Sequence, residues 1–244
     1  MSAGMLPVAI LAGGVATRLQ PLTRTIPKAL VDVNGKPFIA HQLALLRAHG
    51  VERVVVCAGY LGEMIQEYLG DGGRFGLNVE FAFDGPRLLG TGGAIRRALP
   101  MLGKGFFVLY GDSYLPCDYR AVQRAFAESG RLALMTVFAN EGRWDRSNVE
   151  CVGGRIVAYD KRHPTARMRH LDYGLGVFTS SAFALGPDRE AYDLAEVYQE
   201  LLERGELAAH EVSERFYEVG SVAGLEETRR YLAAQAPTER GGVP

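Results

Sequence analysis

Two glycines and two cations near the start of the chain are residue types that bind phosphate groups. Gly13-Gly14 follows the apolar run of residues 8–12, and Arg18 and Lys28 come shortly after it. Paired glycines let backbone N–H groups approach an anion, and the guanidinium fork matches phosphate oxygens. The segment therefore predicts a site for a phosphorylated ligand. Taken alone, the glycines fit a simple strand-to-helix turn equally well, and they match neither the P-loop nor the Rossmann glycine pattern.

Two further segments have residue types suited to nucleotide and metal binding. Leu89-Gly90-Thr91-Gly92-Gly93-Ala94 is rich in small residues, which let a flat base lie against the backbone. Gly111-Asp112 follows the apolar run of residues 106–110. A carboxylate there suits magnesium, which prefers oxygen ligands. Each segment also has a simpler interpretation, because the first fits a turn with a helix cap and a Gly-Asp pair after a strand is usually only a turn.

Hydrophobic periodicity predicts the elements that must position these residues. Continuous apolar runs predict buried strands at residues 8–12, 54–58, 79–83, 106–110 and 132–139. Three- and four-residue spacing predicts helices between them, at residues 39–49, 62–69, 92–99 and 119–128. This alternation predicts an α/β fold with a mostly parallel sheet and helices on both faces. Ligands bind beyond the carboxyl ends of such strands, so we expect Gly13-Gly14 and Asp112 at one edge.

The second half of the chain has weaker patterns. They predict strands at residues 155–159 and 174–179 and a helix at residues 194–204. A final helix at residues 224–234 is expected to pack back on the sheet. Residues 237–244 lack apolar periodicity and are expected to form a disordered tail. The sequence shows neither an internal repeat nor a linker, so residues 1–236 are predicted to form a single domain.

Composition and charge limit the kind of partner. The chain is 48% hydrophobic and 23% charged, as in ordinary globular proteins. Its formal net charge of -1 gives no bulk attraction to nucleic acid or to an anionic membrane. The apolar run of residues 6–12 is too short to span a bilayer and lacks the basic start and cleavage site of a signal peptide. We therefore expect a cytoplasmic protein with small-molecule partners, without nucleic acid or membrane.

A longer pattern surrounds the first glycines. It reads Leu11-Ala12-Gly13-Gly14-x-x-Thr17-Arg18-Leu19-x-Pro21-Leu22-Thr23, then Pro27-Lys28-Ala29-Leu30 and Lys36-Pro37. This pattern closely resembles the signature of the sugar-1-phosphate nucleotidylyltransferases. The resemblance implies a Rossmann-like three-layer α/β fold of the nucleotide-diphospho-sugar transferase type, with a mostly parallel mixed central sheet. One departure is Ala16, where the family usually has Gly.

The resemblance also implies roles for particular residues on the nucleotide side. Arg18 and Lys28 are implied to be catalytic and to hold the triphosphate. The nucleotide-binding residues are implied to be Leu11, Ala12, Gly13, Gly14, Thr17, Gly90, Thr91 and Gly92, the last three reading the base.

On the acceptor side, the resemblance implies that Lys161 is catalytic and holds the sugar phosphate, and that Asp172 and Gly174 line the sugar pocket. Asp112 is implied to be a Mg²⁺ ligand. The second ligand of the family is commonly an Asp two residues before a Gly, and here Glu218 occupies that place. A lysine between charged neighbours, such as Lys161, is by itself most often a solvated surface residue.

These roles imply an enzyme that joins a nucleoside triphosphate and a sugar 1-phosphate, with Mg²⁺, to give a nucleotide-sugar and pyrophosphate. The chain is similar to the short heptose-1-phosphate and mannose-1-phosphate guanylyltransferases, which favours guanylyl transfer. Cytidylyl, uridylyl or thymidylyl transfer to another phosphorylated acceptor remains an alternative. A catalytically silent nucleotide-sugar sensor is a second alternative, because Ala16 and Glu218 depart from the family pattern.

Overall fold

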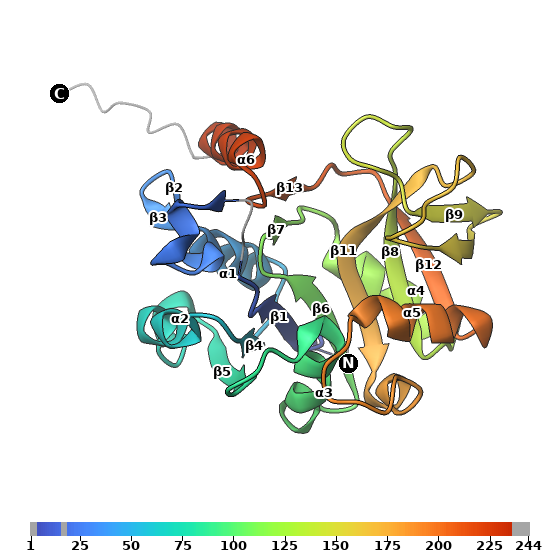
Figure 1. Cartoon of the computed structure of the whole chain (residues 1–244), viewed down its shortest axis with the longest axis horizontal. Helices are drawn as coiled ribbons and strands as arrows, with labels where there is room; N and C mark the ends of the chain where they lie inside the picture. The colour runs from blue at the N-terminus through green and yellow to red at the C-terminus, as the bar shows by residue number, and fades with distance from the viewer. Residues whose placement is uncertain (1–3, 16–18, 236–244) are drawn as a thin grey trace.

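The fold is built on a mixed nine-stranded sheet with helices on both faces (Figure 1). The structure is a computed structural model that describes residues 4–15 and 19–235. The strands of this sheet are β1 (Val8–Ala12), β4 (Arg53–Ala58), β5 (Asn78–Phe83), β6 (Gly105–Tyr110), β8 (Ala133–Ala139), β9 (Val149–Val152), β10 (Arg155–Tyr159), β11 (His170–Thr179) and β12 (Leu207–Val212).

The order of the strands places a ligand-binding crevice beside β1. Strands β6, β1, β4 and β5 are parallel neighbours, with β1 pairing β4 on one side and β6 on the other. The chain runs from β1 outward to β4 and β5 and then returns to the opposite side of β1 as β6. Such a reversal of direction opens a crevice outside the carboxyl ends of the two strands. Beyond β6 the sheet continues with β11, which is antiparallel to β6 and to β8.

Alternation along the strands fills two separate cores. Val8 and Ile10 of β1 face one core, covered by helices α1 (Phe38–Ala48), α2 (Gly62–Leu69) and α4 (Tyr119–Ser129). Ala9 faces the other core, covered by α3 (Gly90–Leu102) and α5 (Leu194–Glu203). Side chains along a strand point alternately to the two faces of the sheet, so the continuous apolar run of β1 contributes side chains to both cores. The predicted three-layer α/β class is confirmed.

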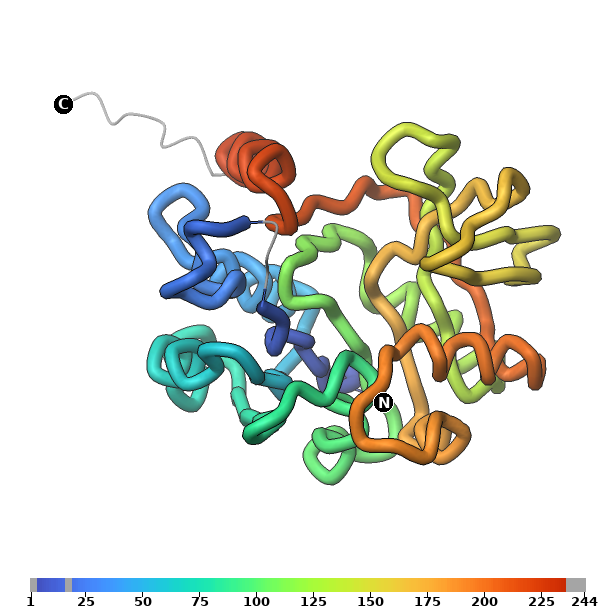
Figure 2. Tube along the Cα trace, in the orientation of Figure 1, coloured from blue at the N-terminus to red at the C-terminus, as the bar shows by residue number. Residues whose placement is uncertain are grey.

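Two small sheets lie outside the central one. The first pairs β2 (Asp32–Val33) with β3 (Lys36–Pro37), and the second pairs β7 (Ser113–Tyr114) with β13 (Tyr217–Glu218). Figure 2 shows the red segment after β12 crossing the molecule to reach the blue segment that holds β2. Short 3-10 helices are formed at Leu22–Arg24, Lys28–Leu30, Gly73–Phe75 and Ser180–Ala184.

The last helix corrects one expectation. Helix α6 (Val222–Gln235) packs against β13 and β2, whereas the sequence predicted packing on the central sheet. Its buried residues Leu225 and Leu232 join a third cluster with Val31, Val33, Phe38 and Val219. This small cluster buries Leu225 and Leu232, while Val222 at the start of α6 stays 68% exposed.

Most predicted elements have close counterparts in the structure. The strand at 8–12 and the helix at 62–69 have the predicted bounds. The predicted strand at 174–179 begins earlier, at His170, and this extension carries Asp172 beyond the end of β6. No helix of the described residues is both long enough and apolar enough to cross a membrane. Residues 237–244 lie outside the described residues.

Candidate active site

A cleft of about 240 Å³ opens at the carboxyl ends of β1 and β6. It brings together segments that the sequence singled out separately. Its lining includes Leu11, Ala12, Gly13, Gly14, Lys28, Gly90, Thr91 and Asp112. Gly92 is not part of this lining, and Thr17 and Arg18 lie outside the described residues.

The first glycine pair has different surroundings at its two positions. A Cβ on Gly13 would lie 3.1 Å from the backbone nitrogen of Gly59 and 3.5 Å from Oδ2 of Asp84, so the chain is closely packed there. A Cβ on Gly14 would meet nothing within 4 Å. The carbonyl of Gly13 also accepts a hydrogen bond of 3.1 Å from the N–H of Tyr60. Gly13 therefore fixes the turn after β1, and Gly14 leaves open space at the cleft.

Lys28 and Asp112 form an ion pair in the cleft. Nζ of Lys28 lies 2.7 Å from Oδ2 of Asp112, and the side chains are 19% and 24% exposed. The hydroxyl of Ser113 donates to the other carboxylate oxygen at 3.4 Å. A carboxylate and an ammonium group, both largely buried, thus face the same open space, where an incoming polyphosphate or cation can contact both.

Two short strands bring Glu218 beside Asp112. In the β7–β13 pair, Glu218 is opposite Ser113, and the N–H of Val219 donates to the carbonyl of Asp112 at 2.9 Å. The carbonyl of Glu218 accepts from Oγ1 of Thr228 in α6, at 3.0 Å. The backbones at the two predicted positions are therefore neighbours, although they lie far apart in sequence. Asp112 lines the cleft, and Glu218 is not among the lining residues.

The donor set fits magnesium better than a metal that needs a complete protein cage. Across residues 4–15 and 19–235, no group of three or more His, Cys, Asp or Glu side chains could hold a metal ion. Magnesium usually takes one or two carboxylates and completes its shell with water and substrate phosphates. The ammonium group of Lys28 already occupies a cation position against Asp112.

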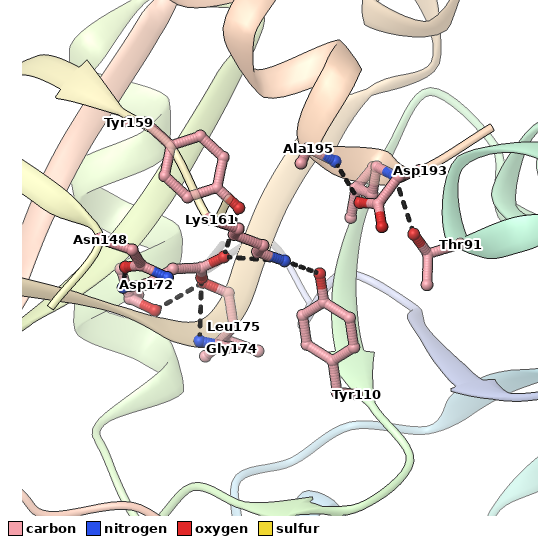
Figure 3. Close-up of polar contacts among 12 residues, drawn as sticks. Thr91, Tyr110, Asn148, Tyr159, Lys161, Asp172, Gly174, Leu175, Asp193 and Ala195 are labelled. Carbon is pink, nitrogen blue, oxygen red and sulfur yellow. Dashed lines mark hydrogen bonds and ion pairs between the residues drawn. The ribbon is translucent and has the colours of Figure 1, made fainter. Parts of the chain in front are cut away.

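The residues predicted for the acceptor side form a second polar cluster next to the cleft (Figure 3). Nζ of Lys161 donates to the hydroxyl of Tyr110 at 3.0 Å and lies 3.6 Å from Oδ2 of Asp172. That oxygen also accepts from the hydroxyl of Tyr159 at 3.0 Å, and Oδ1 accepts from the N–H of Gly174 at 3.1 Å. Tyr110 also lines the cleft, so it links the cleft to Lys161.

Lys161 stays charged across the neutral range. Burial alone would lower its pKa, but the neighbouring Tyr110 and Asp172 outweigh burial and raise the pKa above its ordinary value. Burial raises the pKa of Tyr110 to about 12, so that hydroxyl is protonated at neutral pH. The Lys161 ammonium group is therefore hydrogen-bonded to a neutral hydroxyl and paired with the Asp172 carboxylate.

The second glycine-rich segment forms the start of α3. Gly90 has a φ of +69°, and a Cβ there would lie 2.6 Å from the carbonyl oxygen of Tyr192. The hydroxyl of Thr91 accepts a hydrogen bond of 2.8 Å from the N–H of Leu194. Gly92 packs against the ring of Tyr192 and donates its N–H to the Tyr192 carbonyl at 2.9 Å. Packing against residues 190–194 thus accounts for the glycines, and Gly90 and Thr91 face the cleft.

Several residues of the site belong to none of the sequence motifs. Asp84 is 6% exposed, lines the cleft and accepts a hydrogen bond of 3.2 Å from the N–H of Leu89. Burial raises its pKa above the ordinary value. The sequence could have indicated Asp84, because it is an acidic residue directly after a predicted strand, at the edge of the sheet where ligands bind. Asn148, which accepts from the N–H of Asp172 at 2.9 Å, had no such signal.

The family is shown by comparison with known proteins. The model of the family described as Nucleotidyl transferase matches residues 8–146, more than half of the chain. The chain belongs to this family, and the relatives it matches are sugar-1-phosphate nucleotidylyltransferases. The resemblance stated from the motifs is confirmed.

Three relatives show the range within the family. A UTP–glucose-1-phosphate uridylyltransferase of Synechocystis is 27% identical over 80% of this chain and 55% of the relative. An N-acetylmuramate alpha-1-phosphate uridylyltransferase of Neisseria meningitidis is 41% identical over 46% of this chain and 49% of the relative. A D-glycero-alpha-D-manno-heptose 1-phosphate guanylyltransferase of Campylobacter jejuni is 34% identical over 45% and 48%. The aligned regions span about half the length of these relatives.

Solved structures support the fold. A Bacillus anthracis protein crystallised with sucrose aligns with a TM-score of 0.82, covering 98% of both chains at 20% identity. HddC from Yersinia pseudotuberculosis aligns with a TM-score of 0.76, covering 93% of this chain and 100% of that chain at 23% identity. The chain therefore has the nucleotide-diphospho-sugar transferase fold that the sequence resemblance implied.

Proposed function

We propose that the chain transfers a nucleotidyl group from a nucleoside triphosphate to a sugar 1-phosphate and releases pyrophosphate. The observation that carries this proposal is the joining of two polar clusters through Tyr110. The Lys28–Asp112 pair and Tyr110 line the cleft, and the hydroxyl of Tyr110 accepts a hydrogen bond from Lys161, which pairs with Asp172. A donor and an acceptor that are both phosphorylated need cations on both sides of the reacting phosphorus.

The nucleotide is proposed to lie along the glycine-rich ends of β1 and α3. The open backbone at Gly14 and the ammonium group of Lys28 would contact the triphosphate, with Arg18 as a further cation predicted from the sequence. Gly90 and Thr91 would contact the base. Preorganised donors of this kind lower the barrier because they stabilise charge that develops in the transition state.

The acceptor is proposed to bind at Lys161, with its sugar hydroxyls near Asp172 and Gly174. An oxygen of the sugar phosphate attacks the α-phosphorus and forms a new P–O bond. The bond from that phosphorus to the bridging oxygen breaks, and pyrophosphate leaves with the electron pair. The sugar phosphate is already an anion, so the reaction needs no protein nucleophile. Lys161 contributes by orientation and by neutralising charge.

Asp112 and Glu218 are the residues proposed to hold magnesium. Bound magnesium would neutralise phosphate charge and assist the departure of pyrophosphate. Glu218 has one more methylene than the Asp usual in the family, and retained water can accommodate the longer side chain. Asp112 is also the ion-pair partner of Lys28, so the carboxylate that would hold the metal lies beside the ammonium group proposed to contact the phosphates.

Asp84 favours guanine as the base within this proposal. Relatives differ in their nucleotide, since the Neisseria and Campylobacter proteins are a uridylyltransferase and a guanylyltransferase. An ionised carboxylate accepts hydrogen bonds from two adjacent donors, which guanine presents at N1 and its amino group. Uracil and thymine present one donor between two carbonyl oxygens. A buried carboxylate in the cleft therefore supports guanylyl transfer, with mannose or heptose 1-phosphate as proposed acceptors.

A pyrophosphate-release screen tests this function. The four ribonucleoside triphosphates and dTTP are each combined with a panel of sugar 1-phosphates, in the presence of Mg²⁺. We expect release that requires both substrates, with GTP and mannose or heptose 1-phosphate giving the highest rate. Release without any sugar phosphate would indicate hydrolysis. Nucleotide binding without release from any pair would support the silent-sensor alternative.

A further inference from the structure

The turn that carries Asp112 is held by a buried amide from α1. Gln42 is 1% exposed, and its Nε2 group donates to the carbonyl of Tyr110 at 3.0 Å and to that of Ser113 at 2.8 Å. These two carbonyls stand on either side of Gly111-Asp112. Both hydrogens of one NH₂ group are therefore used to fix the two ends of the turn.

The turn needs such a partner because the sheet ends there. The pairing of β6 with β11 begins at Leu109, and β6 itself ends at Tyr110. Carbonyl groups beyond that point lose their ladder partners, and a buried carbonyl without a partner is costly. Gln42 supplies the missing donors from a helix that packs under the same edge of the sheet.

Other contacts hold the same turn through the backbone. The N–H of Gly111 donates to the carbonyl of Leu11 in β1 at 3.0 Å, and a Cβ on Gly111 would lie 2.6 Å from that oxygen. The N–H of Val219 donates to the carbonyl of Asp112 at 2.9 Å. The main chain around Asp112 is thus held from β1, from β13 and from α1. The hold from α1 is made by a side chain, so a single substitution can remove it.

The buried amide of Gln42 lowers the stability of the fold at its position on α1. Gln42 lies on the buried stripe formed with Ile39, Leu43 and Leu46, where an apolar residue would complete the packing. Its own Oε1 is buried without a hydrogen-bond partner among the described residues. The two hydrogen bonds that its NH₂ group makes explain why a polar residue occupies this buried position.

We infer that Gln42 is a positioning residue that fixes the Asp112 carboxylate for divalent-metal binding. The inference rests on the proposed function, because it takes Asp112 as a metal ligand. Gln42 touches neither substrate nor metal and acts through the backbone of residues 110–113. Removing its donors should let the turn shift, so that the carboxylate meets the metal in a poorer geometry.

The first experiment measures metal binding directly. Mn²⁺ is titrated into the full chain and the free ion is followed by electron paramagnetic resonance. The variant is Gln42→Met, which keeps the length of the side chain and removes both donors. We expect its dissociation constant for Mn²⁺ to rise about tenfold or more, the lower range for loss of an outer partner of a metal ligand. Leu46→Ala, which disturbs the buried face of the same helix, is the matched control and should stay within about twofold of the wild type.

A second measurement follows the turn itself. Amide hydrogen exchange over residues 216–221 reports the hydrogen bond from Val219 to Asp112. We expect faster exchange there in Gln42→Met than in Leu46→Ala, relative to the strands of the central sheet. If Gln42→Met does not fold, Gln42→Glu takes its place in both experiments. This variant retains a polar side chain and lacks both N–H donors when ionised.

The outcomes separate this inference from the function on which it rests. If Asp112→Asn loses Mn²⁺ binding while the Gln42 variant binds it as Leu46→Ala does, the positioning role is wrong and the metal site stands. If Asp112→Asn binds Mn²⁺ like the wild type, the proposed metal site itself is wrong. Weaker binding in both Asp112→Asn and the Gln42 variant, with the control unchanged, supports the inference.

Discussion

Replacing Lys161 with Gln should reduce turnover far more than stability. The substitution removes the cation proposed to bind the acceptor phosphate. Loss of one preorganised donor in other enzymes costs about 10²–10³-fold, or about 2.7–4 kcal/mol. The Lys161 side chain is 33% exposed, so solvent screens part of its charge. We therefore expect the lower end, a fall of about 10²-fold in kcat/KM for the sugar 1-phosphate.

The effect of the same change on stability should be small. Asp172 is 4% exposed and loses its ion pair with Lys161, but it keeps its hydrogen bonds from Tyr159 and Gly174. A partly exposed ion pair contributes about 0–1 kcal/mol. In a chain of this size, that shifts the thermal midpoint by at most about 4 °C.

Steady-state kinetics and thermal unfolding of Lys161→Gln check both parts. Lys104→Gln, an exposed lysine in the segment before β6, is the matched control and should leave both quantities unchanged. The KM for the nucleoside triphosphate should change little in Lys161→Gln. Activity within about twofold of the wild type in the folded variant would refute the acceptor role.

Three further predictions concern the nucleotide side. Asp112→Asn should nearly abolish turnover and raise the Mg²⁺ concentration needed for half-maximal rate, while Glu218→Asp should do less harm; unchanged metal dependence in both argues against this metal site. Asp84→Asn should reduce the preference for GTP over UTP, measured as a ratio of kcat/KM. In the wild type the preference for GTP should fall at acid pH, because burial raises the pKa of Asp84 and acid protonates it. If the preference of Asp84→Asn had the same pH dependence as that of the wild type, Asp84 would not be the residue that selects the base. Arg18→Ala, predicted from the sequence alone, should lower turnover by about 10²-fold or more, and near-normal activity would remove Arg18 from the site.

Burial of Asp84 also has a consequence for stability. Its pKa is raised in the folded state, so the folded protein binds the proton more tightly than the unfolded chain does. Stability from this group is therefore present at acid pH and is lost as pH rises through the unfolded and then the folded pKa. Asp84→Asn should raise the thermal midpoint at neutral pH more than at acid pH. Equal shifts at both pH values, measured by differential scanning calorimetry, would contradict this.

Long apolar runs made the central sheet predictable, whereas the short elements around the site were not. Strands such as β1 bury both faces and therefore have a strong local pattern. The strands β7 and β13 are two residues long, too short to show any periodicity. Yet their pairing is what brings Glu218 beside Asp112, and the sequence supplied that proximity only through the family resemblance.

The polar residues of the site differ in how well sequence can reveal them. Gln42 lies at helical spacing from Ile39 and Leu46, so its burial could have been predicted from the stripe it interrupts. Tyr110 ends a predicted strand, but its contact with Lys161 depends on the loop after β10 folding over β6. Contacts between distant segments follow from the whole fold and leave no local pattern.

The central claim is that the sugar phosphate attacks the α-phosphorus of the nucleotide. The most direct test uses a sugar 1-phosphate whose four phosphate oxygens carry ¹⁸O, with the products analysed by mass spectrometry. We expect all of the label in the nucleotide-sugar and none in pyrophosphate. Label in pyrophosphate, or nucleoside monophosphate formed without any nucleotide-sugar, would contradict the account.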